Sequence, residues 1–279
     1  MIDSEDTRMD NNERFDLQRI GLLIIGDELL LGRREDKHVP RAREYFSAVN
    51  VDISWIWFAG DDMNLLVDLL RMIRSRGDDC FSFGGIGATP DDRTRQAMAE
   101  AFDTRIIRHP EAVALIEHQF GDGAYPNRIL MAELPEGAML IPNAHNNIPG
   151  FSCGRVHCLP GFPEMAWPML DWVVKNRYRV GDNRRVELVS FIVNGAKESE
   201  LVQLLTACQD RFPAASFSSL PRFSDGTSWQ IELAVRGAAE DVAAGAKLLE
   251  EGVRRLGFQV DSKQNRMVKQ EKTGSDPRF

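Results

Sequence analysis

Acidic residues and glycines gather at three places in the sequence where an apolar run ends. They form the segments Gly26-Asp27-Glu28, Gly60-Asp61-Asp62 and 84–92. Carboxylates beside exposed backbone N–H groups suit a Mg²⁺ ion that also binds phosphate oxygens of a ligand. A single acidic pair after a strand is more often a solvent-facing helix N-cap. Three such segments at successive strand ends together favour a site for a phosphorylated small molecule.

The segment GGIGATPDD, residues 84–92, is the sharpest of the three. Glycine at positions Gly84, Gly85 and Gly87 would let the backbone approach a ligand and point its amides inward. Thr89 adds a hydroxyl group, and the helix expected next presents its positive end to an anion. The segment lacks the Gly-Lys-Ser/Thr of a P-loop and the last glycine of the dinucleotide fingerprint. A turn that needs glycine only for its backbone geometry is the alternative.

Two later segments are further candidates for ligand contact. CLPGFPEM, residues 158–165, is a proline and glycine loop that leads into a helix, and it could also be a simple strand-to-helix turn. NAHNNIPGF, residues 143–151, is rich in small polar residues and is either a binding loop or a solvated connection. The candidate ligand-binding residues are Gly26, Asp27, Glu28, Gly84, Gly85, Gly87, Thr89, Asp91, Pro160, Gly161 and Glu164.

A strand, loop and helix rhythm precedes and follows these segments. Strands are predicted within 19–26, 51–59, 78–83, 138–142 and 154–160, and helices within 39–50, 63–76, 93–102, 110–120 and 164–176. This alternation predicts an α/β fold with a parallel sheet and helices on both faces. Ligands bind such sheets at the carboxyl ends of the strands, where the three acidic segments would converge.

The sequence predicts two domains between two tails. Residues 1–18 are polar and are expected to be a disordered tail, and residues 19–178 form the α/β domain. A small α+β domain is predicted over 184–258, with strands near 185–193, 214–219 and 229–236 and helices at 198–210 and 239–256. Residues 259–279 are charged and are expected to be a second tail.

Composition narrows the class of protein. The 279 residues carry a formal net charge of −8 at pH 7, which argues against a general nucleic-acid binder. The segment 194–197 also lacks the second glycine of the clamp with which a K-homology module grips RNA. No apolar run is long enough to cross a membrane, and the N-terminus has no apolar signal region, so we expect a cytoplasmic protein. Homo-oligomerisation is the default expectation for an enzyme of this kind.

The motifs IGDELLLG, AGDD, GGIGATPDDRTRQAMAEAF, LPEGAMLIPN, IPGF and LPGFPEM occur in this order. Together they resemble the molybdopterin-binding domain family, and above all the N-terminal part of the competence/damage-inducible protein A group, over about residues 19–175. The resemblance implies a three-layer α/β/α fold with a mostly parallel sheet, and binding of molybdopterin in molybdenum cofactor assembly. Adenylyltransferases of the wider family use two aspartates with Mg²⁺, and these align onto Asp61 and Asp92, the candidate catalytic and metal-binding residues. The competence branch implies instead metal-dependent hydrolysis of pyrophosphate bonds in ADP-ribose-like molecules.

This chain departs from the family pattern on the ligand side. The usual Asp-Thr/Ser-Asn of the first motif is here Asp36, Lys37 and His38, and Ala88 replaces a proline before the threonine. Such changes affect the identity of the substrate more than the fold.

Three functions share this one site. The first is a molybdopterin-binding protein that could also catalyse Mg²⁺-dependent adenylyl transfer to the pterin phosphate, with Gly85, Gly87 and Thr89 holding that phosphate. The second is a metal-dependent nucleotide pyrophosphatase. The third is a binding protein without catalytic activity, an alternative that the altered positions Asp36 to His38 and Ala88 support.

Overall fold

The computed structural model describes residues 14–17, 19–49, 51–179, 186–224 and 228–266. The chain divides into two compact units, one up to residue 181 and the other from residue 182. Each unit has a core of its own and is described by itself. Residues 180–185 lie outside the described residues.

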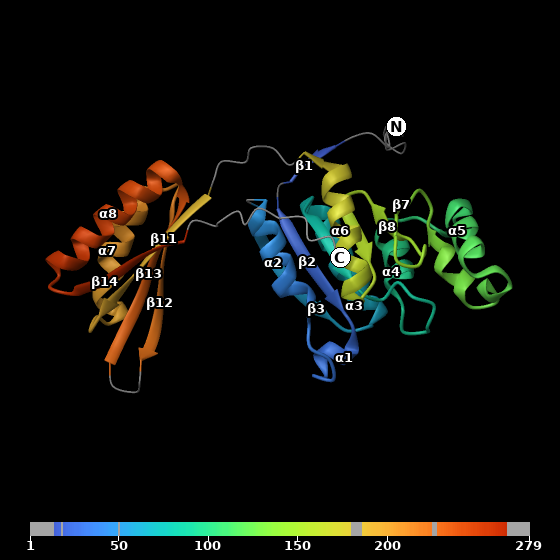
Figure 1. Cartoon of the computed structure of the whole chain (residues 1–279), viewed down its shortest axis with the longest axis horizontal. Helices are drawn as coiled ribbons and strands as arrows, with labels where there is room; N and C mark the ends of the chain where they lie inside the picture. Colours follow the sequence, from blue (N-terminus) through green and yellow to red (C-terminus); the bar gives the residue numbers. More distant parts are fainter. Residues whose placement is uncertain (1–13, 18, 50, 180–185, 225–227, 267–279) are drawn as a thin grey trace, which may run out of the picture. The chain divides into compact units, whose positions relative to one another are not determined.

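A six-stranded sheet forms the centre of the first unit, in the order β3-β2-β4-β9-β8-β7. Figure 1 labels β2, β3, β7 and β8 of this sheet. The strands are β2 (Ile20–Ile25), β3 (Ile53–Ala59), β4 (Asp79–Phe83), β7 (Met139–Ile141), β8 (Gly150–Cys153) and β9 (Val156–Leu159). Strands β3, β2, β4 and β9 pair in parallel, whereas β8 and β7 are antiparallel to their neighbours. The predicted mostly parallel sheet is confirmed.

Helices cover both faces of this sheet. They are α1 (Asp27–Leu30), α2 (His38–Ala48), α3 (Met63–Arg76), α4 (Thr94–Ala101), α5 (Pro110–Phe120) and α6 (Pro163–Arg177). Side chains of α3, α4 and α5 belong to one hydrophobic cluster, and those of α2 and α6 to another. The result is the three-layer α/β/α arrangement that the sequence predicted.

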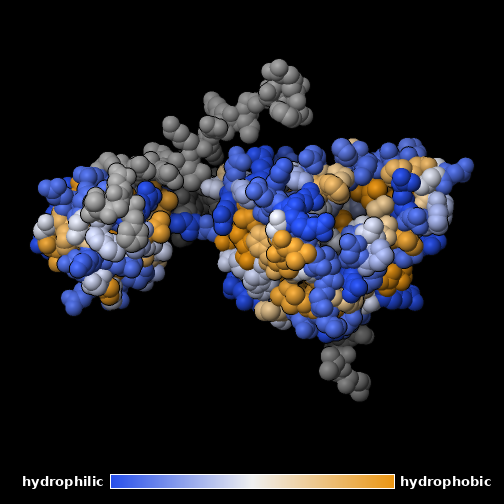
Figure 2. All heavy atoms as spheres, turned by 90° about the horizontal axis from the view of Figure 1, so that it is seen from below, coloured by the Kyte–Doolittle hydropathy of each residue, from blue (hydrophilic) through white to orange (hydrophobic). Residues whose placement is uncertain are grey.

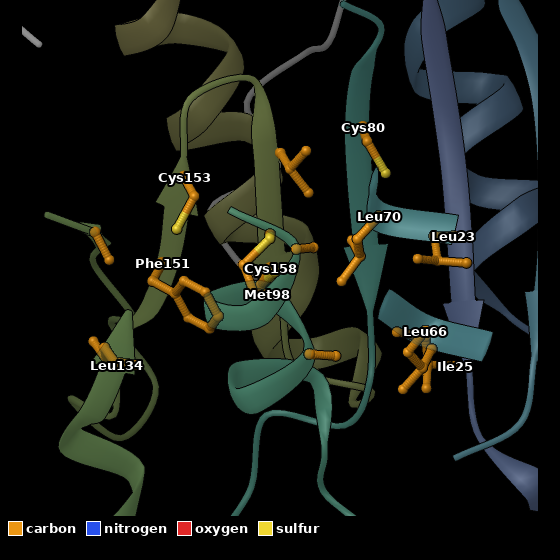
Figure 3. Packing of buried hydrophobic residues seen from close by; sticks show 14 of the residues in the cluster. Leu23, Ile25, Leu66, Leu70, Cys80, Met98, Leu134, Phe151, Cys153 and Cys158 are labelled. Atoms are coloured by element: carbon orange, nitrogen blue, oxygen red, sulfur yellow. The ribbon is translucent and has the colours of Figure 1, made fainter. Parts of the chain in front are cut away.

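Alternation along β2 explains why both faces are covered. Leu23 and Ile25 enter the cluster with α3 and α4, while Leu22 and Ile24 enter the cluster with α2 and α6. Figure 3 shows the first of these clusters, where Leu23 and Ile25 lie near side chains of α3. A strand buried on both faces reads as a continuous apolar run, which is why the sequence revealed it.

Short elements complete the first unit. Strands β5 (Ile106–Arg108) and β6 (Glu133–Pro135) form an antiparallel pair, and two 3₁₀ turns span Gly121–Ala124 and Arg128–Ala132. Strand β1 (Phe15–Asp16) pairs in parallel with β10 (Tyr178–Arg179).

The predicted tail over residues 1–18 is therefore wrong at Phe15 and Asp16. The Phe15 ring lies 6.1 Å from that of Tyr178, and the guanidinium of Arg155 lies 4.8 Å from it. These contacts with distant residues could not be read from local sequence. Residues 1–13 of the expected tail lie outside the described residues.

The second unit has the order β-α-β-β-α-β. Its elements are β11 (Val186–Asn194), α7 (Glu198–Arg211), β12 (Ser216–Ser224), β13 (Ser228–Ala238), α8 (Ala239–Arg255) and β14 (Gln259–Arg266). The strands form an antiparallel sheet in the order β12-β13-β11-β14, a ferredoxin-like arrangement.

Strand β14 corrects the predicted charged tail over 259–279 at its first eight residues, 259–266. Its sequence QVDSKQNR carries one apolar residue, Val260, which packs against the core of the unit. Backbone pairing with β11 makes it a strand, and such pairing leaves no hydrophobic pattern to detect. Residues 267–279 lie outside the described residues.

Hydrophilic side chains occupy much of the surface seen in Figure 2, with smaller apolar areas between them. Of the helices in the described part of the chain, none is long and apolar enough to span a membrane.

Candidate functional site

The loops that follow β2, β3, β4 and β9 meet at one edge of the first sheet and line a pocket of about 480 Å³. This volume is within the range of small-molecule sites. Most residues selected from the sequence line it, namely Gly26, Glu28, Asp61, Gly84, Gly85, Gly87, Thr89, Asp91, Asp92, Pro160 and Gly161. Asp27 and Glu164 do not line it.

Asp27 instead connects two of the loops through hydrogen bonds. Its amide donates to Asp61 Oδ2 at 3.0 Å, and the Asp61 amide donates back to Asp27 Oδ1 at 3.2 Å. A Cβ atom at Gly60 would overlap the Asp27 carboxylate, so glycine is required beside it. The reciprocal pair fixes the loops after β2 and β3 relative to each other.

Asp62, the second acid of the Gly60-Asp61-Asp62 segment, caps its own helix. Its Oδ1 accepts the Leu65 amide at 2.8 Å and caps the start of α3. Of the pair Asp61-Asp62, the structure thus leaves Asp61 for the pocket.

The Asp61 carboxyl lies in an acidic environment. Burial raises its pKa, and the carboxylates of Asp27, Glu28 and Asp91 raise it further, against the opposing hydrogen bond from the Asp27 amide. A cation next to Asp61 would relieve this repulsion.

The carbonyl groups of the glycine loop are turned toward α4. Thr94 donates its amide to Gly85 O and its hydroxyl to Gly84 O, both at 3.0 Å, and Arg95 Nη2 donates to Gly87 O at 2.6 Å. Among the described residues, the amides of Gly85, Ile86 and Gly87 donate to no other protein group. They are therefore free to bind an anion beside the N-terminus of α4.

Arg95 is a supporting residue that the sequence analysis missed. Its side chain is 3% exposed and its Nη1 donates to the carbonyls of Leu130 and Glu133. An arginine in an amphipathic helix is normally read as a surface residue, so the sequence carries no signal of this role.

Two of the glycines are required by the backbone. Gly84 and Gly85 have φ of 105° and 69°, where residues with a side chain are strained. A Cβ at Gly84 would also overlap Ile25 O, and one at Gly85 would overlap Thr94 Oγ1.

Asp92 closes the end of the glycine loop. Its Oδ2 accepts the amide of Thr89 at 2.9 Å and also accepts the Thr89 hydroxyl. The hydroxyl proton of Thr89 is thus used within the protein, so this group could only accept a hydrogen bond from a ligand.

The donor set fits a metal only in combination with a ligand. Among the described residues, no group of three or more His, Cys, Asp and Glu side chains is arranged to hold a metal ion. Asp61 and Asp92, both on the pocket wall, could supply two carboxylates to Mg²⁺, with phosphate and water oxygens completing its octahedron.

Residues not selected from the sequence complete the pocket. They are Ile25, Arg34, Ile86, Ala88, Met131, Asn143, Asn146, Ile148, Phe162 and Met165. Of the two interpretations of residues 143–151, the placement favours a pocket-lining loop that ends in β8.

Asn143 organises that loop. Its side chain, 4% exposed, accepts the His145 amide and donates to Asn146 Oδ1 and Ile148 O. The side-chain amide of Asn146 in turn donates to the thioether of Met165 at 3.3 Å. This sulfur is a weak acceptor that a ligand could replace.

His38 ties the loop after β9 to the start of α2. Its ring stacks on Phe83 with centroids 4.4 Å apart, and its Nε2 lies 3.3 Å from Gly161 O. Burial lowers its pKa. Asp36 accepts the amides of His38 and Val39 at 2.9 Å and so caps α2. His38, which differs from the family motif, therefore has a structural role at its position.

Known proteins resemble this chain in sequence and in fold. The sequence model of a family described as a probable molybdopterin binding domain matches residues 21–179. A CinA-like protein of a Picosynechococcus species is 30% identical over 242 residues, which cover 82% of this chain and 56% of that protein. A CinA-like protein of Geobacter metallireducens is 29% identical over 243 residues, which cover 84% and 58%.

The chain thus spans somewhat more than half the length of these curated relatives. Among solved structures, the protein CinA with unknown function from Thermoplasma acidophilum aligns with a TM-score of 0.54 and 24% identity. The alignment covers 58% of this chain and 100% of that one, and it shows a common fold. The resemblance read from the sequence motifs is confirmed.

Proposed function

The chain belongs to the probable molybdopterin binding domain family, and from this premise we propose that its pocket binds molybdopterin by the terminal phosphate together with Mg²⁺. The observation that carries the proposal is that the pocket is lined both by the glycine loop with its free amides and by the carboxylates of Asp61 and Asp92.

Charge explains why a metal is needed. Glu28, Asp61, Asp91 and Asp92 line the pocket and would repel a phosphate dianion. Mg²⁺ held by Asp61 and Asp92 would neutralise part of this charge and bridge to the phosphate. The phosphate oxygens that do not bind the metal would accept the free amides of the loop.

Several other lining residues suit a flat heterocycle. Met131, Ile148 and Met165 supply apolar and polarisable contacts, and Asn146 supplies an amide donor. A pterin ring combines an apolar face with hydrogen-bonding edges and would match this surface.

We propose adenylyl transfer as the reaction of this site. A phosphate oxygen of molybdopterin would attack the α-phosphorus of a nucleoside triphosphate, and the bond to the departing pyrophosphate would break. The role of Asp61 and Asp92 would be to position the metal at the phosphates, since phosphoryl transfer depends mainly on positioning and charge neutralisation.

A second candidate reaction is metal-dependent hydrolysis of a pyrophosphate bond. The similarity to CinA-like proteins extends over 82–84% of this chain, beyond the family match at 21–179. This extent favours the branch for which the sequence resemblance implies hydrolysis of ADP-ribose-like molecules.

Product analysis tests and separates these candidates. The protein is incubated with molybdopterin and ATP, and separately with ADP-ribose, each with Mg²⁺ or with EDTA. Adenylylated molybdopterin formed only with Mg²⁺ supports transfer, and AMP released only with Mg²⁺ from ADP-ribose supports hydrolysis. Binding without any product supports the non-catalytic alternative.

Two aspartate variants, one a test and the other its control, examine the assignment of the metal ligands. Asp92→Asn retains an oxygen that can accept from Thr89 and should reduce Mg²⁺-dependent turnover at least about tenfold. Asp62→Asn removes a nearby charge but keeps an effective N-cap, so it should leave turnover unchanged. Equal activity of Asp92→Asn and the wild type would overturn the metal assignment.

A further inference from the structure

Of the described residues that line the pocket, Arg34 alone has a cationic side chain. It lies between α1 and α2, outside every motif that the sequence analysis selected. The other charged residues of the lining are acidic and disfavour an anionic ligand, so the presence of a cation among them needs an explanation.

Three contacts hold the Arg34 guanidinium. Nη2 donates to Gly161 O at 3.4 Å, the guanidinium carbon lies 5.5 Å from the centroid of the Phe162 ring, and Nη1 is 3.9 Å from Glu28 Oε1. The separation from Glu28 is at the outer limit of an ion pair. The side chain remains 43% exposed, and most of its five N–H donors are available to a ligand.

Gly161 connects this guanidinium to the glycine loop. A Cβ at Gly161 would lie 3.5 Å from Gly84 Cα, so the two loops pass in direct contact. Arg34 is therefore anchored beside the start of the loop whose amides are free. An anionic group attached directly to one bound on that loop would be within its reach.

We propose that Arg34 forms a second anion subsite, which takes the second phosphate of a diphosphate group. A guanidinium binds two phosphate oxygens in a fork geometry, and a diphosphate would replace the long contact to Glu28. The pocket therefore selects ligands with a diphosphate over those with one phosphate. The inference rests on the proposed function, in which the glycine loop and the metal take the first phosphate.

This subsite serves both candidate reactions. A diphosphate linkage is present in the adenylylated product of the transfer and in the substrate of the hydrolysis. Arg34 would thus bind the diphosphate, which is the group that the two reactions have in common.

The test compares the binding of two inorganic probes, pyrophosphate and phosphate, by calorimetric titration in the presence of Mg²⁺. Arg34→Gln should weaken pyrophosphate binding about tenfold or more and change phosphate binding less than about twofold, and Arg34→Lys should fall between. Arg33→Gln is the matched control, because Arg33 is exposed and does not line the pocket. It should bind both probes as the wild type does.

The outcomes distinguish a failure of the Arg34 subsite from a failure of the proposed function. If the wild type binds both probes and Arg34→Gln weakens both equally or neither, the Arg34 subsite is overturned and the proposed function stands. If the wild type binds neither probe in Mg²⁺, the proposed function fails and the subsite with it.

Discussion

The Asp61 carboxyl is held where its negative charge is unfavourable, since burial and three neighbouring acids raise its pKa. Because this pKa is raised in the folded protein, the ionised form costs stability as the pH rises through it. Asp61→Asn keeps an oxygen for the Asp27 amide but removes the charge. We expect the variant to be more stable than the wild type at neutral pH in EDTA, by up to about 1 kcal/mol after screening by solvent.

Urea unfolding in EDTA and in Mg²⁺ measures this difference. Magnesium should stabilise the wild type and have little effect on Asp61→Asn, because only the wild type keeps both metal ligands. A variant less stable than the wild type in EDTA would contradict the repulsion, and equal stabilisation by Mg²⁺ would contradict the metal role.

His157 belongs to a buried polar network in the core of the first unit. Tyr178 donates to Asp79 Oδ1 at 2.7 Å, so His157 Nε2, 2.6 Å from the Tyr178 oxygen, must be the donor of that pair. Nδ1 then accepts from Ser152, whose hydroxyl is 2.8 Å away. Burial, with Arg177 and Arg155 nearby, lowers the pKa of His157 to about 3, so this neutral form persists.

The free energy of unfolding should therefore depend on the protonation of His157. The unfolded chain binds a proton below the ordinary pKa of 6.5, whereas the folded protein does not until about pH 3. Stability is full above this window and is lost as the pH falls through it, by up to about 1.4 kcal/mol per pH unit. His157→Gln should be less stable at pH 7 but lose stability less steeply toward pH 4.5. Parallel urea-derived curves for the two proteins would rule out this coupling.

The sequence predicted which residues belong to the site better than it predicted what each of them does. The sequence predicted Asp61, Gly85 and Asp92 as site residues, and all three line the pocket. It also proposed Asp27 and Glu164, which do not, because a side chain's direction depends on partners distant in sequence. Arg34 reaches the pocket through loop packing, for which no local pattern exists, whereas Asn146 belongs to the segment 143–151 that the sequence offered as a binding loop.

At the scale of elements, the glycine loop depends on α4. Arg95 holds the loop and the segment around Leu130 to Glu133 through three carbonyl groups. Arg95→Met would leave these carbonyls without their donor, and hydrogen bonds to charged groups contribute about 1.5–3 kcal/mol. We expect a loss of about 2–4 kcal/mol in unfolding free energy and weaker binding of Mg²⁺-phosphate.

Thermal and urea unfolding measure the stability, and Arg93→Met, two positions before Arg95, is the control. Arg93 makes a long 3.5 Å contact to Pro90 O and an electrostatic interaction with the exposed Asp91, and it should tolerate the change. Similar stability of the two variants would show that Arg95 does not anchor the loop.

The elements themselves were largely predictable where apolar periodicity is strong. Helix α5 lies at the predicted residues 110–120, and buried strands such as β2 were found from continuous apolar runs. Strands β5, β6 and β8 are three or four residues long and escaped prediction. Strand β14 escaped because its polar residues are paired through the backbone.

At the scale of the whole molecule, the pocket lies within one unit. Every residue that lines it precedes residue 166, whereas the second unit starts after residue 181 and has a core of its own. We expect residues 1–181 alone to bind Mg²⁺-pyrophosphate within about twofold of the whole chain. Calorimetric titration of both proteins checks this, and loss of binding in a folded fragment would show that the second unit contributes to the site.

The fold class and family were readable from the sequence because the motifs mark strand ends in a fixed order. The magnesium requirement, the cytoplasmic location and the homo-oligomeric state stay predictions, since each depends on a ligand, a compartment or a partner chain. The division into units follows from two separate hydrophobic cores.

Metal-dependent binding of a phosphorylated ligand is tested most directly by an anaerobic calorimetric titration of the whole protein with molybdopterin, first in Mg²⁺ and then in EDTA. If the carboxylates of Asp61 and Asp92 bind a phosphorylated ligand through a metal, affinity should be at least about tenfold higher in Mg²⁺, and Asp92→Asn should lose this increment. Equal affinity in Mg²⁺ and EDTA, or no binding in either, would contradict the account.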